Sequence, residues 1–384
     1  MSTAPKRLKV AVATSTRADW GLLQPLACAL RSAGAEVAVI ASNMHLLAES
    51  GHTIDEIRAD GFEPVAEIAP GADPAQTFAL TSEGMARALR SCVPDCVIIL
   101  GDRYEMAGAA MAAVMAGVPI VHIAGGTVSE GAFDDSFRHV ITKLSTLHFP
   151  ETEQARRRII QMGEDPACVF ATGAIGIHNL LRVPLMSRAE LERSIEFSLD
   201  RNTFLVTLHA ATLDKLPPLR QLDNLLEALD SSGCRLLFTH PNNDVDPAPL
   251  IARINEFCAL KPEERKVIPS LGRVRYLSAL QFVGAVVGNS SSGIVEVPSA
   301  GIPTLDIGCR QQGRQRAESV IHCGSSSEEI AEGLRRVLSP EVRALASLRR
   351  NPYEGTDTPG TMVREIMRFP FRPYPTKHFH DYID

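Results

Sequence analysis

Three observations predict an α/β protein built from two doubly wound domains. The chain has 384 residues, enough for two or three domains of ~150 residues each. Short apolar runs alternate with segments of helical periodicity, which is typical of parallel sheets covered by helices on both faces. This alternation stops over residues 183–201 and then restarts. Two sheets therefore account for the predicted strands better than one very wide sheet.

Apolar runs in the first half predict seven strands. These are residues 8–13, 36–41, 64–68, 96–100, 119–123, 146–149 and 169–171. The segments between them carry apolar residues three or four positions apart, which predicts helices, among them residues 20–31 and 106–116. The regular succession of strand and helix predicts that the strands run parallel.

The second half repeats the pattern. Its predicted strands are residues 203–208, 235–239, 266–268, 284–287 and 303–307. The tail from residue 352 is rich in Pro and aromatic residues, and we expect it to return to the first half and form a helix over residues 361–367. The predicted domains are therefore residues 1–180 with 361–384, and residues 181–360.

Composition narrows the classes of partner. The formal net charge of −6 provides no basic field for a polyanion, so nucleic acid is not an expected partner. No apolar run approaches the ~20 residues of a membrane span, and the polar start of the chain lacks the pattern of a signal peptide. The eight cysteines lack metal-site spacing. We therefore expect reduced thiols, no metal, no membrane partner and a cytoplasmic protein.

A serine-rich segment is the first candidate site, because ligands of doubly wound folds bind beyond the carboxyl ends of the strands. Ser290, Ser291, Ser292 and Gly293 come after a predicted strand and enter a predicted helix. Their hydroxyls and backbone N–H groups can bind a phosphate, helped by the helix dipole. A serine-rich helix cap without a ligand has the same sequence. Glu296, one turn into the helix, can reach ligand hydroxyls or face solvent.

A cationic segment follows the next predicted strand, at residues 308–316. Arg310, Arg314 and Arg316 concentrate positive charge there in a chain that is acidic overall. Because the guanidinium fork fits phosphate oxygens, this segment and the serines are candidates for one shared anion site. A solvated basic turn would have the same composition.

The first predicted strand ends in hydroxyl groups and one cation, in Thr14, Ser15, Thr16 and Arg17. Rossmann dehydrogenases carry a G-x-G-x-x-G loop at this point, and this chain does not. A nicotinamide or flavin cofactor is therefore not expected.

Ionisable groups follow two more strands of the first half. Asp102 can act as an acid or base with Arg103 tuning its pKa, or can cap a helix within a structural ion pair. Farther along, two glycines let a ligand approach the backbone closely. The possible proton carriers that follow them are Glu130, Asp134, Asp135 and His139, with Arg138 among them. One of the two adjacent aspartates is expected to cap a helix over residues 136–145.

Histidines end two predicted strands of the second half. They are His209 and His240, and Asn242 follows shortly after the second. Each histidine can serve as an acid, a base or a phosphate partner, or can be structural. A G-x-S-x-G nucleophile elbow is absent, so a serine hydrolase is not indicated.

In combination these motifs resemble a known family, the UDP-hydrolysing UDP-N-acetylglucosamine 2-epimerases of sialic-acid-type sugar pathways. Residues 101–105, 130–145, 289–296 and 308–316 carry the resemblance, in the family's order and over almost the whole chain. It implies two Rossmann-like domains facing across a cleft, as in a glycosyltransferase-B-like fold, with UDP in that cleft. It also implies a homo-oligomer, either a dimer or a tetramer.

The resemblance also implies a reaction. UDP is eliminated across C1 and C2 of the sugar to leave a 2-acetamidoglycal, and water then adds with inverted configuration at C2 to release a mannosamine-type sugar. Asp102, Asp135 and His209 match positions that the family uses for this chemistry, although Asp134 competes with Asp135. Residues expected to contact UDP or the sugar are Arg17, Arg103, Arg138, His139, His240, Asn242, Ser290, Ser291, Ser292, Gly293, Glu296, Arg310 and Arg314.

The chain departs from the family at several points. Ala124 precedes the paired glycines, where some members have a glutamate thought to be catalytic, and Thr127 follows them, where an acidic residue is common. Ala210 and Ala211 replace the Pro-Val of many relatives. We therefore expect Glu130 to substitute for the missing proton carrier. The small residues leave two substrates open, UDP-N-acetylglucosamine and the legionaminic-acid precursor UDP-2,4-diacetamido-2,4,6-trideoxyglucose.

Three other functions fit parts of the sequence. A non-hydrolysing 2-epimerase would release intact UDP-N-acetylmannosamine. A glycosyltransferase of the same fold would need an acceptor site, which the sequence does not indicate. A UDP-sugar sensor without activity would have no need of so many proton carriers.

Overall fold

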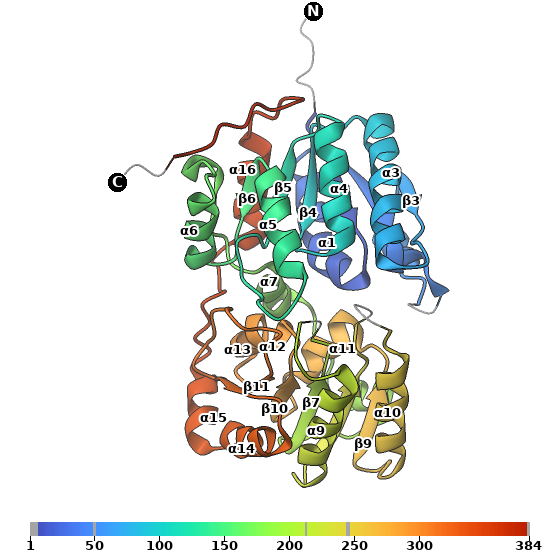
Figure 1. The fold of residues 1–384 in the computed structure, drawn as a ribbon, viewed down its shortest axis with the longest axis vertical. Helices are drawn as coiled ribbons and strands as arrows, with labels where there is room; N and C mark the ends of the chain where they lie inside the picture. The colour runs from blue at the N-terminus through green and yellow to red at the C-terminus, as the bar shows by residue number, and fades with distance from the viewer. Residues whose placement is uncertain (1–6, 49–50, 212, 243–245, 382–384) are drawn as a thin grey trace, which may run out of the picture. The chain divides into compact units, whose positions relative to one another are not determined.

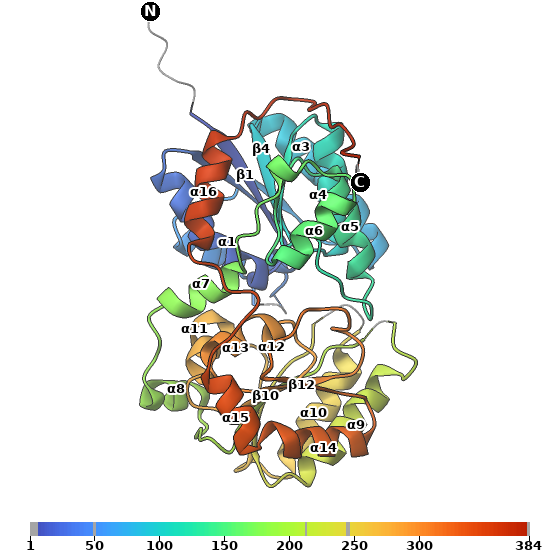
Figure 2. The same ribbon diagram turned by 90° about the vertical axis from the view of Figure 1, so that its left-hand side faces the viewer.

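The computed structural model describes residues 7–48, 51–211, 213–242 and 246–381. They form two compact units, shown in Figures 1 and 2. Unit 1 contains the residues up to Thr127, Asp134–Asn179 and those from Gly355 onward, and unit 2 contains Val128–Phe133 and Leu180–Glu354.

These units differ from the predicted domains in two respects. Residues 128–133, which we placed in the first domain, belong to unit 2, and the chain returns to unit 1 at Gly355 rather than at residue 361. Parts of both predicted domains lie outside the described residues, namely 1–6, 49–50, 212, 243–245 and 382–384.

Unit 1 is built on a six-stranded parallel sheet in the order β3-β2-β1-β4-β5-β6. The strands are β1 (Lys9–Thr14), β2 (Glu36–Ser42), β3 (Ala66–Ile68), β4 (Cys96–Leu100), β5 (Ile120–Ile123) and β6 (Leu147–Phe149). Six of the seven predicted strands are confirmed. The seventh, residues 169–171, is wrong, because only Val169 pairs with the sheet, in an isolated bridge to His148.

Helices cover both faces of this sheet. They are α1 (Arg17–Ser32), α2 (Ile54–Ala59), α3 (Pro74–Cys92), α4 (Tyr104–Met115), α5 (Asp134–Leu144), α6 (Glu153–Gln161) and α16 (Thr358–Arg368). A further helix, α7 (Ile175–Arg182), begins in unit 1 and ends in unit 2. Alternation along β1 divides the core: Val10 and Val12 pack with residues of α1 and α16, whereas Ala11 and Ala13 pack with residues of α3, α4 and α5. Strand side chains point to opposite faces in turn, which is why the run is apolar throughout.

Unit 2 has a second six-stranded parallel sheet in the order β12-β11-β10-β7-β8-β9. Its strands are β7 (Thr203–Thr207), β8 (Arg235–Thr239), β9 (Arg265–Ile268), β10 (Ala285–Gly288), β11 (Thr304–Ile307) and β12 (Val320–Cys323). The five predicted strands are confirmed. Sequence analysis missed β12 because this edge strand has only two buried residues, followed by the exposed His322 and the half-buried Cys323.

The helices of unit 2 also lie on both sides of its sheet. They are α8 (Arg188–Ile195), α9 (Pro218–Asp230), α10 (Ala248–Ala259), α11 (Gly272–Ala279), α12 (Ser292–Val295), α13 (Val297–Ala300), α14 (Ser327–Val337) and α15 (Pro340–Ser347). The interruption at residues 183–201 therefore contains a helix. A capping box formed by Ser187 and Glu190 begins it.

Both sheets have the same topology. Numbered from the first strand of its own unit, each sheet reads 3-2-1-4-5-6, the order of the doubly wound dinucleotide-binding fold. The strand order reverses between β1 and β4 in unit 1 and between β7 and β10 in unit 2. These two switch points are where such folds bind ligands.

The C-terminal part of the chain completes unit 1. The predicted helix is confirmed as α16, which packs beside α1 (Figure 2). Thr358 donates a hydrogen bond to the carbonyl of Thr172 at 2.6 Å. A Cβ on Gly355 would lie 1.9 Å from that same carbonyl oxygen, so only glycine permits this approach. Among the described residues, no helix is long and apolar enough to cross a membrane.

Candidate functional site

A buried arginine joins two of the predicted catalytic carboxylates in unit 1. Arg138 on α5 forms ion pairs with Asp102, which follows β4, and with Asp135, whose Oδ1 lies 3.1 Å from Nη1. The same Nη1 donates to the carbonyl of Thr127 at 2.8 Å. The two carboxylates keep part of their surface exposed, whereas the arginine side chain is 1% exposed. The cluster therefore presents two oriented carboxylates on a buried cationic support.

This geometry changes the role that we predicted for Arg138. We expected it to contact the substrate, but the structure places it inside unit 1. Burial lowers the pKa of its guanidinium, yet Asp102 and Asp135 outweigh burial and raise the pKa above its usual value. Arg138 therefore stays charged, and it orients the two carboxylates with which it pairs.

Arg103 forms an ion pair with the neighbouring Glu105. Its Nε donates to the carboxylate of Glu105 at 2.6 Å, and Asn43 donates to the same oxygen at 3.1 Å. Glu105 is completely buried at the start of α4. Arg138 forms an ion pair with Asp102, and the tuning of Asp102 by Arg103 stays a prediction.

The start of α5 also differs from the prediction. Asp134 and Asp135 both lie in the first turn of the helix, so neither precedes the helix as its cap. Negative charge in a first turn interacts favourably with the helix dipole. His139 lies one turn on, with Nε2 3.6 Å from Asp135. Burial lowers the pKa of His139 despite the nearby carboxylate.

His122 supports the turn that carries Asp102, and sequence analysis did not single it out. The histidine is fully buried on β5, with Nε2 2.8 Å from the carbonyl of Gly101 and Nδ1 3.2 Å from the hydroxyl of Thr142. A neutral ring satisfies both contacts if Nε2 donates and Nδ1 accepts. Gly125 permits this packing, because a Cβ there would lie 2.7 Å from Nδ1.

This neutral histidine predicts how stability depends on pH. Burial lowers the pKa of His122 from 6.5 to about 3. Below pH 6.5 the unfolded chain binds a proton at this position that the folded chain excludes, so stability falls as the pH falls. We expect His122 alone to remove about 1.4 kcal/mol of unfolding free energy per pH unit between about pH 6 and pH 4.

Urea denaturation of the wild type and of His122→Gln at a series of pH values checks this expectation. The wild type should lose its advantage over the variant progressively as the pH falls, because glutamine does not titrate. His378→Gln, at an exposed position, should run parallel to the wild type. A constant difference between the wild type and His122→Gln at every pH would contradict the assignment.

Arg17 begins α1 at the switch point of unit 1. The helix is capped by Thr16, whose side chain forms a capping box with Asp19. Both Nε and Nη2 of Arg17 pair with the carboxylate of Glu56, at 3.1 and 2.7 Å. The arginine is 41% exposed, so its guanidinium can reach a ligand by exchanging one anionic partner for another.

The predicted proton carrier Glu130 lies in Val128–Phe133, the segment from the first half of the chain that belongs to unit 2. Its backbone N–H donates to the carbonyl of Gln312 at 3.1 Å, and Arg314 contacts the hydroxyl of Ser129 at 3.5 Å. Two glycines allow this close approach. A Cβ on Gly131 would lie 2.5 Å from the carbonyl of Cys309, and one on Gly313 would lie 2.5 Å from a methyl group of Val128. Glu130 is thereby fixed beside the predicted cationic segment, with an exposed side chain.

His209 follows β7 at the switch point of unit 2. The backbone N–H of Asn242 donates to its Nδ1 at 3.0 Å. Burial, with a contribution from Arg310, lowers the pKa of His209 to about 3. Because the ring is neutral and Nδ1 accepts a hydrogen bond, the proton lies on Nε2. His209, which we predicted as an acid, a base or a phosphate partner, can therefore donate a hydrogen bond from Nε2.

Other predicted residues surround the same edge of unit 2. Arg310 donates to the carbonyl of Asn289 at 3.2 Å, and the buried Gln311 donates to the same oxygen at 2.9 Å. His240 is half-buried after β8, and burial lowers its pKa. Sequence analysis quoted Asn289 within a motif but assigned it no role. Its place directly after a strand at the switch point was the available signal.

The helix that we predicted after the serines is present, but it is a single turn long. Ser292 opens this helix, α12, which ends at Val295 and is followed after Glu296 by a second single turn, α13. Pro298 explains the break, because it has no N–H for the carbonyl four residues earlier and its ring crowds that carbonyl. Gly293 is buried against β11, where a Cβ would lie 2.9 Å from Thr304. This packing requires a glycine, and the ligand contact of Gly293 stays a prediction.

Tyr276 is a second residue that sequence analysis missed. Its hydroxyl hydrogen-bonds to the hydroxyl of Ser292. Burial, and after it the carboxylate of Glu296, raises the pKa of Tyr276 above its usual range. The phenol therefore stays protonated beside the predicted phosphate-binding serines. No sequence signal pointed to it, because only the fold brings α11 next to α12.

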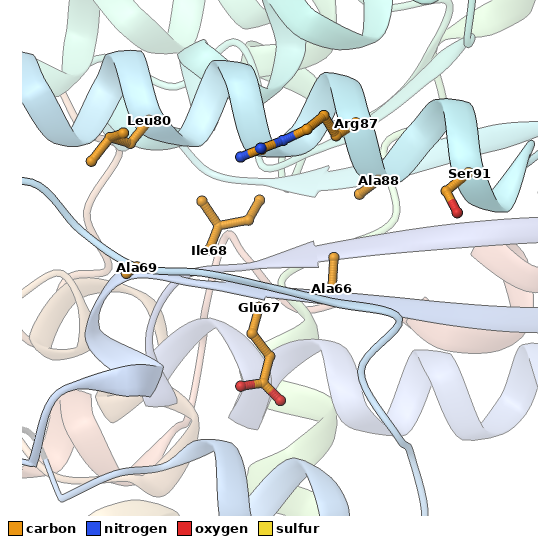
Figure 3. Close-up of a pocket in the computed structure, with 9 residues that line it drawn as sticks. Ala66, Glu67, Ile68, Ala69, Leu80, Arg87, Ala88 and Ser91 are labelled. Atoms are coloured by element: carbon orange, nitrogen blue, oxygen red, sulfur yellow. The ribbon is translucent and has the colours of Figure 1, made fainter.

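The groove drawn in Figure 3 is separate from these residues. It measures about 500 Å³ and lies between the edge strand β3 and α3 in unit 1. Its lining is mostly small or apolar and consists of Ala66, Glu67, Ile68, Ala69, Leu80, Gly84, Arg87, Ala88 and Ser91. None of the predicted site residues is among them. Within the described part of the chain, no three His, Cys, Asp or Glu side chains are grouped closely enough to hold a metal ion.

Comparison with known proteins assigns this arrangement to a family. The family model described as UDP-N-acetylglucosamine 2-epimerase matches residues 29–367. This chain belongs to the UDP-N-acetylglucosamine 2-epimerase family. It is therefore a UDP-sugar 2-epimerase, and the predicted family membership is confirmed.

Two curated relatives cover most of this chain. The GDP/UDP-N,N'-diacetylbacillosamine 2-epimerase (hydrolyzing) of Campylobacter jejuni is 31% identical over 343 residues, covering 87% of this chain and 88% of the relative. The polysialic acid biosynthesis protein P7 of Escherichia coli is 32% identical over 372 residues, covering 94% of each chain. Hydrolysing 2-epimerases are thus among the similar proteins.

Solved structures of 2-epimerases share the fold. The UDP-GlcNAc 2-epimerase of Neisseria meningitidis, bound to UDP-GlcNAc, has a TM-score of 0.79 at 16% identity and covers 94% of this chain and 100% of its own. A putative UDP-N-acetylglucosamine 2-epimerase of Listeria monocytogenes has a TM-score of 0.78 at 18% identity, covering 99% and 100%. The predicted glycosyltransferase-B-like class, with two parallel six-stranded α/β sheets, is confirmed.

Proposed function

We propose that this 2-epimerase is of the hydrolysing type. It converts UDP-N-acetylglucosamine, or UDP-2,4-diacetamido-2,4,6-trideoxyglucose, into UDP and a free mannosamine-type sugar through a 2-acetamidoglycal. The product would serve nonulosonic acid biosynthesis, of the sialic or legionaminic type. Similarity to a relative named as hydrolysing supports this proposal.

The observation that carries the proposal is the Asp102–Arg138–Asp135 cluster. A protein that only binds a nucleotide sugar has no use for two carboxylates oriented by one buried cation. Removal of a weakly acidic C2 proton and its return to the other face need more than one positioned proton carrier. We assign these transfers to Asp102, Asp135 and Glu130.

The nucleotide is assigned to the carboxyl edge of unit 2. There the neutral His209 offers an Nε2–H, and Arg310 lies on the neighbouring loop. Such donors stabilise the charge that develops on a departing pyrophosphate. The further nucleotide contacts that we propose are Arg17, His240, Asn242, Ser290, Ser291, Ser292, Glu296 and Arg314, with Arg103 and His139 assigned to the sugar.

The proposed reaction has two balanced steps. In the first, a base removes the C2 proton while the bond from C1 to the phosphate oxygen breaks, and its electrons leave with UDP. The resulting glycal has a double bond between C1 and C2. In the second, water supplies the hydroxyl at C1 and an acid delivers a proton to the opposite face of C2. The sum is hydrolysis with inversion at C2.

Proton NMR in deuterated water tests the proposal. The protein is incubated with UDP-N-acetylglucosamine and, separately, with its 2,4-diacetamido-6-deoxy relative. Free UDP together with a mannosamine-type sugar deuterated at C2 is the expected result, and the faster substrate identifies the sugar class. Intact UDP-N-acetylmannosamine would show a non-hydrolysing enzyme. No turnover of either sugar despite UDP binding would point to a transferase or a sensor.

We further propose that the enzyme is a cytoplasmic homo-oligomer, a dimer or a tetramer. Three apolar side chains support self-association because they form the exposed face of α4: Met111, Val114 and Met115 are 36%, 46% and 77% exposed. All eight cysteines are free, which suits a reducing compartment. Light scattering during size-exclusion chromatography gives the mass in solution, and a monomer at all concentrations would contradict the proposal.

A further inference from the structure

Asn289 connects the two strands that flank the switch point of unit 2. It follows β10. Its side chain is buried and forms two hydrogen bonds with the backbone of His209, which lies beyond the end of β7. The N–H of His209 donates to Oδ1 at 2.7 Å, and Nδ2 donates to the carbonyl of His209 at 2.9 Å. A side-chain amide that satisfies both groups of one residue fixes the orientation of that residue's backbone.

The backbone of Asn289 has a separate task. Its carbonyl accepts the hydrogen bonds from Arg310 and from Gln311 at 3.2 and 2.9 Å. Its N–H donates to the carbonyl of Thr207 at 3.2 Å. The side chain and the backbone of Asn289 thus bind different partners. A substitution of the side chain should therefore remove the contacts to His209 and leave the backbone contacts to Arg310 and Gln311 in place.

Gly288 makes this arrangement possible. Its φ is +137°, and a Cβ there would lie 1.8 Å from the carbonyl oxygen of Thr207. Only glycine brings β10 so close to the end of β7. The side chain of Asn289 thereby reaches His209 beyond the end of the neighbouring strand, although the two residues are 80 positions apart in the chain.

We propose that Asn289 is the positioning residue of His209, holding its backbone so that Nδ1 meets the N–H of Asn242 and Nε2 carries the proton toward the substrate. This inference rests on the proposed function only for the consequence in catalysis. The geometric part concerns the tautomer of one histidine. It can be measured without any substrate.

Replacement of Asn289 by Ala tests the proposal. The backbone contacts to Arg310 and Gln311 remain, so calorimetry with UDP should show a much smaller loss of affinity than the loss of kcat. The loosened histidine should lower kcat on the faster of the two UDP-sugars by about 100-fold, since misplacing a reacting group by ~1 Å has effects of that order. A fall in kcat that is much larger than the fall in UDP affinity is not what a general loss of structure produces.

Nitrogen NMR of protein labelled at histidine provides the second readout. In the wild type His209 should show a single neutral tautomer protonated at Nε2, assigned by comparison with His209→Gln. In Asn289→Ala the signals should become those of a tautomer mixture that titrates at higher pH. Retained tautomer and retained kcat would each overturn the proposal. If the wild type turns over neither UDP-sugar, the proposed function fails while the NMR result still decides the positioning role.

Two further variants address misfolding of Asn289→Ala and a loss of activity that is not specific to this position. Asn289→Asp keeps an acceptor for the N–H of His209 but sets an oxygen against its carbonyl, so it should repeat the loss of kcat if Asn289→Ala does not fold. The matched control is Asn202→Ala. Asn202, which precedes β7, also hydrogen-bonds to a backbone group through its side chain. Its Nδ2 donates to the carbonyl of Gly233 at 3.2 Å. It should leave kcat and the His209 tautomer unchanged, and an equal loss there would overturn the inference.

Discussion

Glu130→Gln is expected to lower turnover by about 1,000-fold, within the range that one acid–base group contributes, while UDP binding stays intact. Glutamine keeps the shape of the side chain but neither takes up nor delivers a proton at neutral pH. The segment should hold its place, because Glu130 is fixed to Gln312 through its backbone N–H. Single-turnover NMR with the preferred UDP-sugar measures the first effect, and calorimetry with UDP the second.

Because Glu130 is exposed, this test separates a loss of turnover from a loss of stability. An exposed side chain contributes little to stability, so the variant should unfold at the same urea concentration as the wild type. Glu263→Gln is the matched control, since it makes the same change at an exposed turn before β9. Wild-type turnover in Glu130→Gln would mean that another group replaces the glutamate absent at Ala124.

Arg138→Met is expected to have the largest effect on stability. Removing one partner of a buried ion pair leaves an uncompensated charge and costs about 3–5 kcal/mol. Asp102 and Asp135 retain 22% and 26% exposure, and water can partly replace the lost cation. We therefore expect the lower end, about 3 kcal/mol, measured by urea denaturation at neutral pH.

Two comparisons separate charge from packing. Arg87→Met removes a similar stem from an exposed pair with Glu83 and should change the free energy of unfolding by less than about 1 kcal/mol. Adding Asp102→Asn to Arg138→Met should recover part of the loss, because one of the two carboxylates no longer lacks a cation. If Arg138→Met is no less stable than Arg87→Met, the buried cluster does not contribute as proposed.

Much of the fold follows from local patterns. Eleven of the twelve strands coincide with predicted apolar runs, and the strands at the centre of each sheet are buried almost throughout, because helices cover both faces. The exception, β12, is an edge strand whose last two residues are exposed or half-buried, and its two buried residues are too few to recognise. The helix break at Glu296 was also readable in principle, since Pro298 follows two residues later.

The sequence by itself determined the family, the doubly wound class and the segments that follow the strands. Only the tertiary structure decided which of those segments meet. Asp102 and Arg138 are 36 positions apart and His209 and Asn289 are 80 apart, so each pairing depends on the strand order. For the same reason it was the fold that buried Arg138 and grouped Glu130 with unit 2. Hydrogen bonds and ion pairs act over a few ångströms of space, whereas a sequence pattern reports only neighbours along the chain.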